Sequence, residues 1–180
     1  DGVISGLAPG KTVIDFGTSL PASTRALGAE VAAAGAQMLD APLGRTPSHA
    51  KDGLLNIMAA GDKATFDAVR PVLDDLGENV FHLGALGAGH TIKLINNFFG
   101  MTTATARSEL MAFIAHCSAR RIRCARIIHG KGYGSGGTAP VLKNRLNSWL
   151  RQHHDVLAFS SAQARHGGSG ALYVLLRSSG

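Results

Sequence analysis

Residues 87–117 decide the fold of this 180-residue chain, and they read GAGHTIKLINNFFGMTTATARSELMAFIAHC. Apolar and small residues recur there at steps of three and four, which is the period of one face of an α-helix. The stretch predicts one continuous helix of roughly 30 residues, or about 45 Å at 1.5 Å per residue. Gly100 lies inside it and marks a bend or a close contact. The residues of the predicted stripe are Ile92, Ile95, Phe99, Thr102, Ala106, Leu110, Phe113 and Cys117.

The segment before this helix alternates between strand and helix signals. Short apolar runs at residues 11–17, 37–42, 53–60 and 79–83 predict strands. Residues 22–34, opened by Pro21 and closed by Gly35, predict a helix, and Asp62 is a suitable N-cap for a second helix at 65–76. This alternation is typical of an α/β fold and predicts a Rossmann-like half sheet.

The segment after the helix begins with a predicted strand at residues 123–129, and a glycine-rich loop follows at 130–137. We expect Thr138 to cap the next helix, with Pro140 in its first turn, where the missing N–H is harmless. Residues 156–160 and 171–177 predict two further strands with no helix between them, while Trp149 and Phe159 fit core positions. The long helix would join the two halves, either as separate domains or as one merged α/β domain.

The composition is that of a globular protein, with 45% hydrophobic and 17% charged residues. No apolar run reaches the roughly 18 residues needed to cross a bilayer, so we expect no membrane partner. No signal peptide is visible, and two cysteines, Cys117 and Cys124, are fewer than a secreted disulfide scaffold carries. We expect two reduced thiols in a protein of cytoplasmic type.

Charge is divided unevenly along the chain. Residues 1–106 carry 7 Lys and Arg against 10 Asp and Glu, a net charge of −3, whereas residues 107–180 carry 11 against 2, a net charge of +9. This asymmetry indicates an anionic partner for the second part, DNA or RNA above all. A basic surface with no partner is the alternative, because net charge speaks first to solubility and non-specific binding.

Lys93 and Asn97 are four residues apart near the start of the long helix, so they share one face. An ammonium beside a carboxamide, near a helix end that favours anions, suits binding a carboxylate or protonating a developing alkoxide. The spacing alone favours the plainer interpretation, an exposed lysine beside a packing asparagine.

The sequences VIDFGTSLPAST, MLDAPLGRTPSHAKDGLLNIMAAGD, FDAVRPVLDDLGENVFHLG and GAGHTIKLINNF occur in one order. Together they resemble the β-hydroxyacid dehydrogenases of the 3-hydroxyisobutyrate type, over residues 1–103. The resemblance implies that Lys93 is the catalytic lysine and Asn97 the substrate-contacting asparagine. Residues 43–46 depart from the family's Ser-Gly-Gly type loop, and Arg45 either grips an acidic substrate or is a plain loop arginine.

A dinucleotide site needs a G-x-G-x-x-G turn after a first strand, with an acidic residue about 20 positions later. No such pattern opens this chain, and the sequence around Gly130 lies far downstream without the acidic residue. We therefore expect no NAD(P) cofactor and no useful dehydrogenase turnover.

In the second part, His129, Gly130, Lys131 and Gly132 come at the end of a predicted strand, and Lys143 and Arg145 follow on the next helix. Cations beside a glycine turn and a helix N-terminus suit a nucleic-acid backbone. Ordinary surface cations on a glycine turn are the alternative. His153 and His154 are adjacent at a helix end and predict no metal site.

The sequences ARSELMAFIAHC, RIIHGKGYGSGGTAPVLKNRLNSWL and VLAFSSAQARHGGSGALYVLLR look like the small MutS-related (Smr) domain, over about residues 106–178. The resemblance implies a small α/β sandwich that binds DNA or RNA, with nicking or endonuclease activity in some members. His129 to Gly132 match the family's HGxG motif, whereas its first strand, with a Leu-Asp-x-His-Gly signature, is absent.

The change from one family to the other falls inside the predicted long helix. We place the boundary between residues 103 and 104, with a truncated Rossmann-type dehydrogenase fragment before it and a truncated Smr-like domain after it. Two truncated partners joined within a helix predict an engineered or recombined chimera with no selected enzymatic activity. A nucleic-acid-binding or residual Smr-type nuclease module is the alternative, and a surviving dehydrogenase is a remote one.

Overall fold

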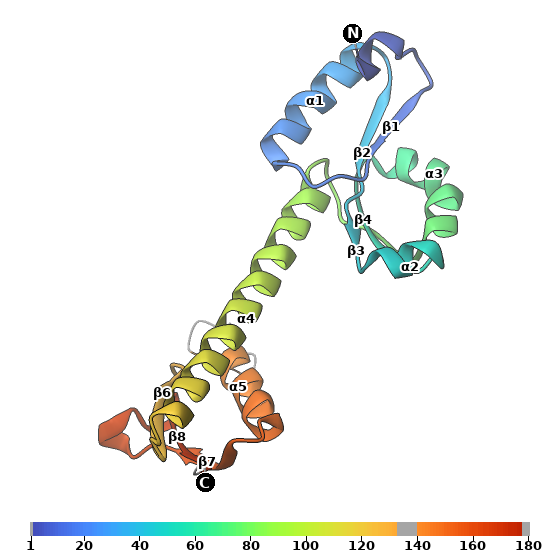
Figure 1. Cartoon of the computed structure of the whole chain (residues 1–180). Helices are drawn as coiled ribbons and strands as arrows, with labels where there is room; N and C mark the ends of the chain where they lie inside the picture. Colours follow the sequence, from blue (N-terminus) through green and yellow to red (C-terminus); the bar gives the residue numbers. More distant parts are fainter. Residues whose placement is uncertain (1, 133–139, 178–180) are drawn as a thin grey trace. The chain divides into compact units, whose positions relative to one another are not determined.

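The computed structural model describes residues 2–132 and 140–177 and divides the chain into two compact units, Asp1–Phe99 and Gly100–Gly180. Their strands form two separate sheets, so the single merged α/β domain considered from the sequence is not what the strand pairing shows (Figure 1). The predicted change of family between residues 103 and 104 lies in the same helix as the division between the units.

The first unit holds a mixed sheet in the order β1-β2-β4-β3, with β5 also paired to β4. Pairs β1–β2 and β4–β5 are parallel, whereas β2–β4 and β3–β4 are antiparallel. The strands are β1 (Thr12–Asp15), β2 (Gln37–Asp40), β3 (Leu43–Gly44), β4 (Leu55–Gly61) and β5 (Gly77–His82). The helices are α1 (Pro21–Ala33), α2 (Pro47–Lys51) and α3 (Lys63–Leu76), preceded by a 3-10 turn at Val3–Gly6.

The core of this unit follows from the sequence pattern. Leu39 of β2, Ile57 of β4 and Leu73 of α3 are fully buried against one another, as expected for strands and a helix that share an apolar layer. Asp62 caps α3 as predicted, since its Oδ1 accepts the N–H of Thr65 at 2.9 Å. That amide lowers the pKa of Asp62 below its usual value.

Helix α4 (Ala88–Ala119) is continuous, as the sequence predicted, and it runs from the first unit into the second. Leu110 and Cys117 of its predicted stripe are buried, whereas Ile92, Ile95, Phe99 and Phe113 of the same stripe are exposed. The stripe prediction is therefore correct for Leu110 and Cys117 and wrong for those four residues, and Ile114, outside the stripe, is buried in place of Phe113.

The second unit is an antiparallel sheet in the order β6-β8-β7, packed against α4 and α5. Its further elements are β6 (Cys124–Ile128), α5 (Val141–Gln152), β7 (Val156–Ser161) and β8 (Ala171–Leu176), with 3-10 turns at Ala164–His166 and Gly168–Gly170. Leu172, Val174 and Leu176 alternate along β8, and all three side chains are buried. Trp149 and Phe159 pack against this core, as expected.

Two sequence-based details need correction. Helix α5 begins at Val141 with Pro140 as its N-cap, so Pro140 precedes the first turn and does not lie in it. The predicted cap Thr138 lies outside the described residues. In the first unit, the residues between the strands predicted at 37–42 and 53–60 were expected to form no helix or strand, but they contain β3 and α2, which are too short to show a period. No helix in the described part of the chain is both long and apolar enough to span a membrane.

Candidate functional site

The turn formed by residues 129–132 follows β6 and depends on two glycines in the left-handed region. Gly130 has φ 79° and Gly132 has φ 78°, conformations that residues with a Cβ seldom adopt. The N–H groups of His129 and Gly130 both donate to the carbonyl oxygen of Gly170, at 3.0 and 2.9 Å. These two amides are therefore engaged within the protein and do not serve as the free phosphate donors that the sequence suggested.

His129 has one engaged and one unengaged ring nitrogen. Its Nδ1 lies 2.7 Å from the carbonyl oxygen of Gly130, and a carbonyl only accepts, so Nδ1 carries the proton. Nε2 is shielded from solvent and makes no hydrogen bond to any residue in the described ranges. In the neutral ring this nitrogen bears a lone pair, which is the arrangement of a general base held by its other nitrogen.

The turn meets the start of α5. A Cβ placed on Gly132 would lie 2.5 Å from Cβ of Pro140, so the two backbones are in close contact. Lys143 and Arg145 follow on α5, which brings the predicted binding residues to one end of the second unit. Lys131 is exposed, and its side chain passes close to Gly170, where an added Cβ would lie 3.1 Å from Lys131 Cγ.

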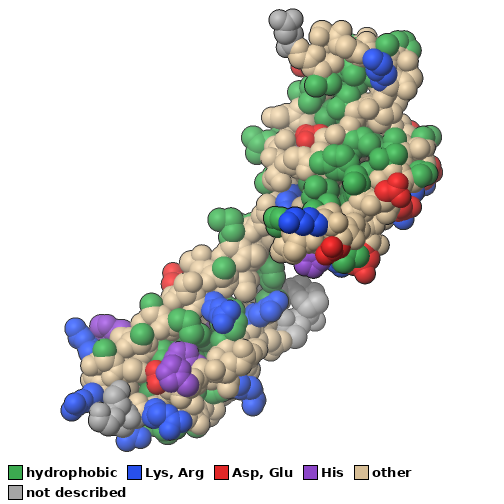
Figure 2. All heavy atoms as spheres, turned by 45° about the vertical axis from the view of Figure 1, so that its right-hand side comes forward, with side chains coloured by type: hydrophobic (Ala, Val, Ile, Leu, Met, Phe, Trp, Pro, Cys, Tyr) green, Lys and Arg blue, Asp and Glu red, His purple; other side chains and the backbone are tan. Residues whose placement is uncertain are grey.

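The cations of the two units differ in how they are neutralised. In the first unit Lys63 pairs with Asp67, Arg70 with Asp74 and Arg45 with Glu78. In the second unit the acidic residues are Glu109 and Asp155, and neither forms an ion pair with an arginine in the part of the chain that the structure describes. Figure 2 shows Lys and Arg side chains over this unit with few acidic ones among them.

A separate cavity in the first unit contains the predicted dehydrogenase residues. The cavity has a volume of about 500 Å³, and Lys93 and Asn97 both line it. Its other lining residues include Arg45, Asn56 and Asn96. Lys93 Nζ donates to the carbonyl oxygen of Leu43 at 2.6 Å. Arg45 donates to the carbonyl oxygen of Leu54 and pairs with Glu78, so its charge is already partnered by a carboxylate.

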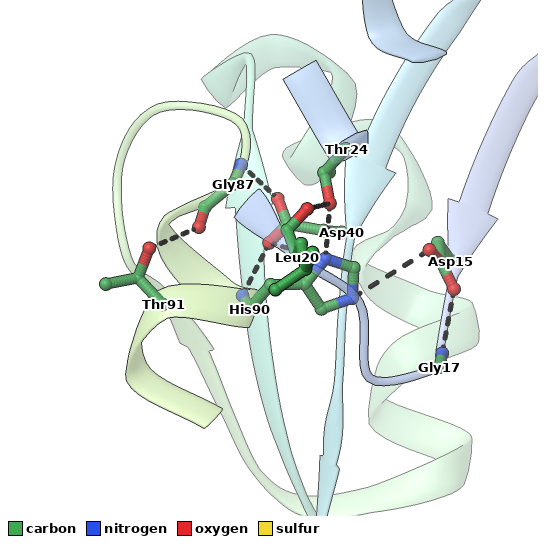
Figure 3. A network of polar contacts seen from close by, with 8 residues as sticks. All are labelled: Asp15, Gly17, Leu20, Thr24, Asp40, Gly87, His90 and Thr91. Atoms are coloured by element: carbon green, nitrogen blue, oxygen red, sulfur yellow. Dashed lines mark hydrogen bonds and ion pairs between the residues drawn. The ribbon is translucent and has the colours of Figure 1, made fainter. Parts of the chain in front are cut away.

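Helix α4 is anchored to the first unit by a buried carboxylate (Figure 3). Asp40 is fully buried at the end of β2, where Oδ1 accepts the N–H of Gly87 and Oδ2 accepts the N–H of His90, both at 2.7 Å. The buried His90 ring contacts Thr24 Oγ1 at 2.7 Å through Nδ1 and lies 3.8 Å from Asp15 through Nε2. A carboxylate on the first amides of a helix satisfies donors that would otherwise be unpaired.

This anchoring requires glycine at position 89. A Cβ placed there would lie 2.2 Å from the carbonyl oxygen of Met58 and 2.8 Å from Asp40 Oδ2. The GAG sequence at residues 87–89 thus allows α4 to begin directly against β4 and the end of β2.

The same geometry bears on the dinucleotide that a Rossmann-like sheet implies. Such a cofactor places its diphosphate on free amides at a helix N-terminus. Asp62 occupies that position on α3 and Asp40 on α4, so these two helix starts do not fit a diphosphate. Helix α1 begins at Pro21, which has no N–H, so its first position offers no donor.

The cysteines and the adjacent histidines were also assigned from the sequence. Cys117 and Cys124 are both free, as expected. Burial raises the pKa of the Cys117 thiol, whereas Cys124 is exposed. The rings of His153 and His154, which predicted no metal site, stack 5.0 Å apart. Together with Asp155 they hold ligand atoms within 4.8 Å of one another, although His153 Nδ1 already accepts the N–H of Asp155.

Comparisons with known proteins match the two units separately. Residues 1–84 match the NAD binding domain of 6-phosphogluconate dehydrogenase, and residues 97–177 match the Smr domain. The chain contains an NAD-binding region of the 3-hydroxyisobutyrate dehydrogenase family and an Smr domain. Both resemblances expected from the sequence are therefore confirmed.

Individual relatives match the chain over stretches of different length. The 2-hydroxy-3-oxopropionate reductase of Escherichia coli is 31% identical over 137 residues, which cover 76% of this chain and 47% of the relative. The ribosome rescue factor SmrB of Vibrio vulnificus is 46% identical over 77 residues, covering 43% of this chain and 40% of the relative. The chain spans less than half the length of these relatives.

A solved structure shows the same relation for the first part of the chain. The 3-hydroxyisobutyrate dehydrogenase of Salmonella typhimurium matches with a TM-score of 0.58 and 34% identity, covering 65% of this chain and 41% of that one.

Sequence reasoning missed Asp40 and His90, although both lie in motifs that it quoted. The available signal was an acidic residue at the end of an apolar strand, because a buried carboxylate needs donors from elsewhere in the chain. The donors are residues more than 40 positions away, so only the fold identifies them.

Proposed function

We propose that the Smr domain of this chain binds nucleic acid, and RNA in particular, through the turn at residues 129–132 and the cations around it. The observation that carries the proposal is the meeting of this turn with the start of α5, which places Lys131, Lys143 and Arg145 at one end of a unit whose arginines lack acidic partners among the described residues. Arginines such as Arg145, which no carboxylate of the described residues neutralises, favour binding of a phosphate chain, because binding releases the counterions of that chain.

The relatives support RNA as the first probe. SmrB proteins of Tolumonas auensis and Vibrio vulnificus are ribosome rescue factors, and they are 43% and 46% identical to this chain over 77 residues. A protein that works on ribosomes meets RNA on their surface.

Fluorescence anisotropy tests the proposal with labelled single- and double-stranded RNA and DNA at two salt concentrations. We expect binding to weaken steeply with salt, and Lys131→Ala to reduce the salt slope by about one. The matched control is Lys51→Ala, which removes one exposed charge from the first unit and should change neither quantity. Flat anisotropy for every probe at low salt would refute the proposal.

His129 supports a residual nuclease as the more specific form of this function. Its Nδ1 is held by the carbonyl of Gly130, and Nε2 is the ring nitrogen that would take a proton from a hydroxyl nucleophile once RNA binding opens this shielded position. End-labelled RNA should be cleaved by the unmodified chain and left intact by His129→Ala, while anisotropy shows both proteins bound. Equal cleavage by both would exclude His129 as the base.

The other two hypotheses stay predictions. An engineered chimera with no selected activity is the interpretation that remains if no probe binds. A surviving dehydrogenase would need a diphosphate site, and the helix starts at α3 and α4 do not fit one.

A further inference from the structure

A groove runs between α4 and α5 within the second unit, away from the residues of the 129–132 turn. It has a volume of about 750 Å³, in the range of small-molecule sites, and its lining includes Thr103, Arg107 and Ser108 of α4 and Arg145 and Trp149 of α5. Figure 1 shows α5 beside the C-terminal part of α4, and both helices contribute to one core.

The groove is cationic and uncompensated. None of its lining residues is acidic, and neither Arg107 nor Arg145 makes a hydrogen bond or ion pair to any residue of the described part of the chain. Arg45 and Arg70 of the first unit are each paired with a carboxylate, whereas Arg107 and Arg145 have no such pairing among the described residues. Guanidinium groups bind phosphate oxygens in a bidentate manner.

Trp149 gives the groove an aromatic component. The residue is partly buried and packs against the core, yet it also contributes to the groove lining. The indole offers a surface on which a base can stack, and the two arginines can bind the adjacent phosphates. Stacking and phosphate binding together are what single-strand recognition requires. Hydroxyls at Thr103 and Ser108 add donors and acceptors suited to a sugar or phosphate.

We infer that this groove holds a nucleotide of a single-stranded RNA or DNA chain, with its base against Trp149 and its phosphates against Arg107 and Arg145. The inference rests on the proposed nucleic-acid binding and adds a second contact surface to it. Base stacking here would make the domain prefer single strands over duplexes, whose bases are already stacked.

The chain contains one tryptophan, and Trp149 lines both this groove and a second cavity that includes His129, so its intrinsic fluorescence reports both places and the Arg107→Ala variant separates them. The experiment titrates the whole chain with unlabelled single-stranded oligouridylate while a labelled copy reports binding by anisotropy. We expect Trp149 fluorescence to be quenched with the same midpoint as the anisotropy change. An abasic oligonucleotide of equal length should bind more weakly, by about fivefold or more, and should leave the fluorescence unchanged.

Arg107→Ala supplies the variant test, because Arg107 lies in the groove and outside the 129–132 turn. We expect it to weaken binding about fivefold. Its matched control is Arg165→Ala, which removes the same charge from an exposed position in the Ala164–His166 turn and should change affinity less than twofold. Far-UV circular dichroism of both variants establishes that they are folded.

The outcomes separate this inference from the proposed function. Two results would overturn the groove as a binding site and leave the proposed nucleic-acid binding intact. One is binding detected by anisotropy with unaltered Trp149 fluorescence, and the other is an equal loss of affinity in Arg107→Ala and Arg165→Ala. Equal affinity for the abasic oligonucleotide would reduce the groove to a phosphate site and overturn base recognition. An absence of binding by every probe would overturn both.

Discussion

Asp40→Asn is the substitution that tests most sharply how α4 is attached to the first unit. The two carboxylate oxygens of Asp40 serve different donors: Oδ1 accepts from the N–H of Gly87 and Oδ2 from the N–H of His90. Asparagine keeps one acceptor and replaces the other with an NH₂ group, which would then face a buried N–H.

The magnitude follows from these contacts. One charge-assisted hydrogen bond is lost, at about 1.5–3 kcal/mol, and the amide left without an acceptor costs a comparable amount where water cannot reach it. Asp40 is fully buried, so solvent does not reduce either effect. We expect the free energy of unfolding to fall by about 3 kcal/mol, which urea denaturation followed by far-UV circular dichroism will measure.

Asp62→Asn is the matched control, because Asp62 also caps a helix but uses one oxygen for both its contacts. Its Oδ1 accepts from the N–H and the hydroxyl of Thr65, so an asparagine oxygen can replace it. Hydrogen exchange over residues 37–42 and 86–92 localises the effect: Asp40→Asn should speed exchange there and Asp62→Asn should not. Equal urea midpoints for the two variants would refute the anchoring argument.

The remaining predictions concern single positions. Gly89→Ala should lower the free energy of unfolding by about 1–3 kcal/mol, because its Cβ clashes with a carbonyl oxygen of β4. Gly100→Ala has nothing within 4 Å of the new Cβ and should raise the free energy of unfolding by up to about 1 kcal/mol. Thermal unfolding of both variants compares the two effects directly. Iodoacetamide followed by mass spectrometry should modify exposed Cys124 rapidly and the folded chain's Cys117 slowly, and equal rates would contradict the burial of Cys117. The hydrogen bond from Thr65 lowers the pKa of Asp62 in the folded chain. The stability that the ionised Asp62 contributes is therefore present above its unfolded pKa, close to 3.8, and is lost as the pH falls through the lower folded pKa. Urea titrations at several pH values should show that Asp62→Asn loses less stability over this acidic range than the unmodified chain.

The local sequence pattern was sufficient to predict elements whose structure depends on their own residues. The steps of three and four in residues 87–117 predicted α4, and Asp62 predicted the start of α3. Pattern failed where structure depends on neighbours: β3 has two residues, and it is held by pairing with Ile57 and Asn56 of β4. A strand of that length carries no period to detect.

The candidate sites divide in the same way. Spacing placed Lys93 and Asn97 on one face of α4, and the structure finds both in one cavity. The state of Arg45 was open in the sequence, because its partner Glu78 is 33 positions away and the ion pair exists only after folding.

By itself, the sequence determined the identity of the two families, the order of the main elements and the uneven charge, since each depends on residues close together in the chain. The tertiary structure decided which polar groups are already engaged. It showed that Asp40 and Asp62 occupy helix starts, that two amides of the 129–132 turn donate to Gly170, and that Arg107, Arg145 and Trp149 line one groove. The physical reason is that a hydrogen bond or an ion pair requires two groups within about 3–4 Å, and contacts between distant residues form only when the chain packs.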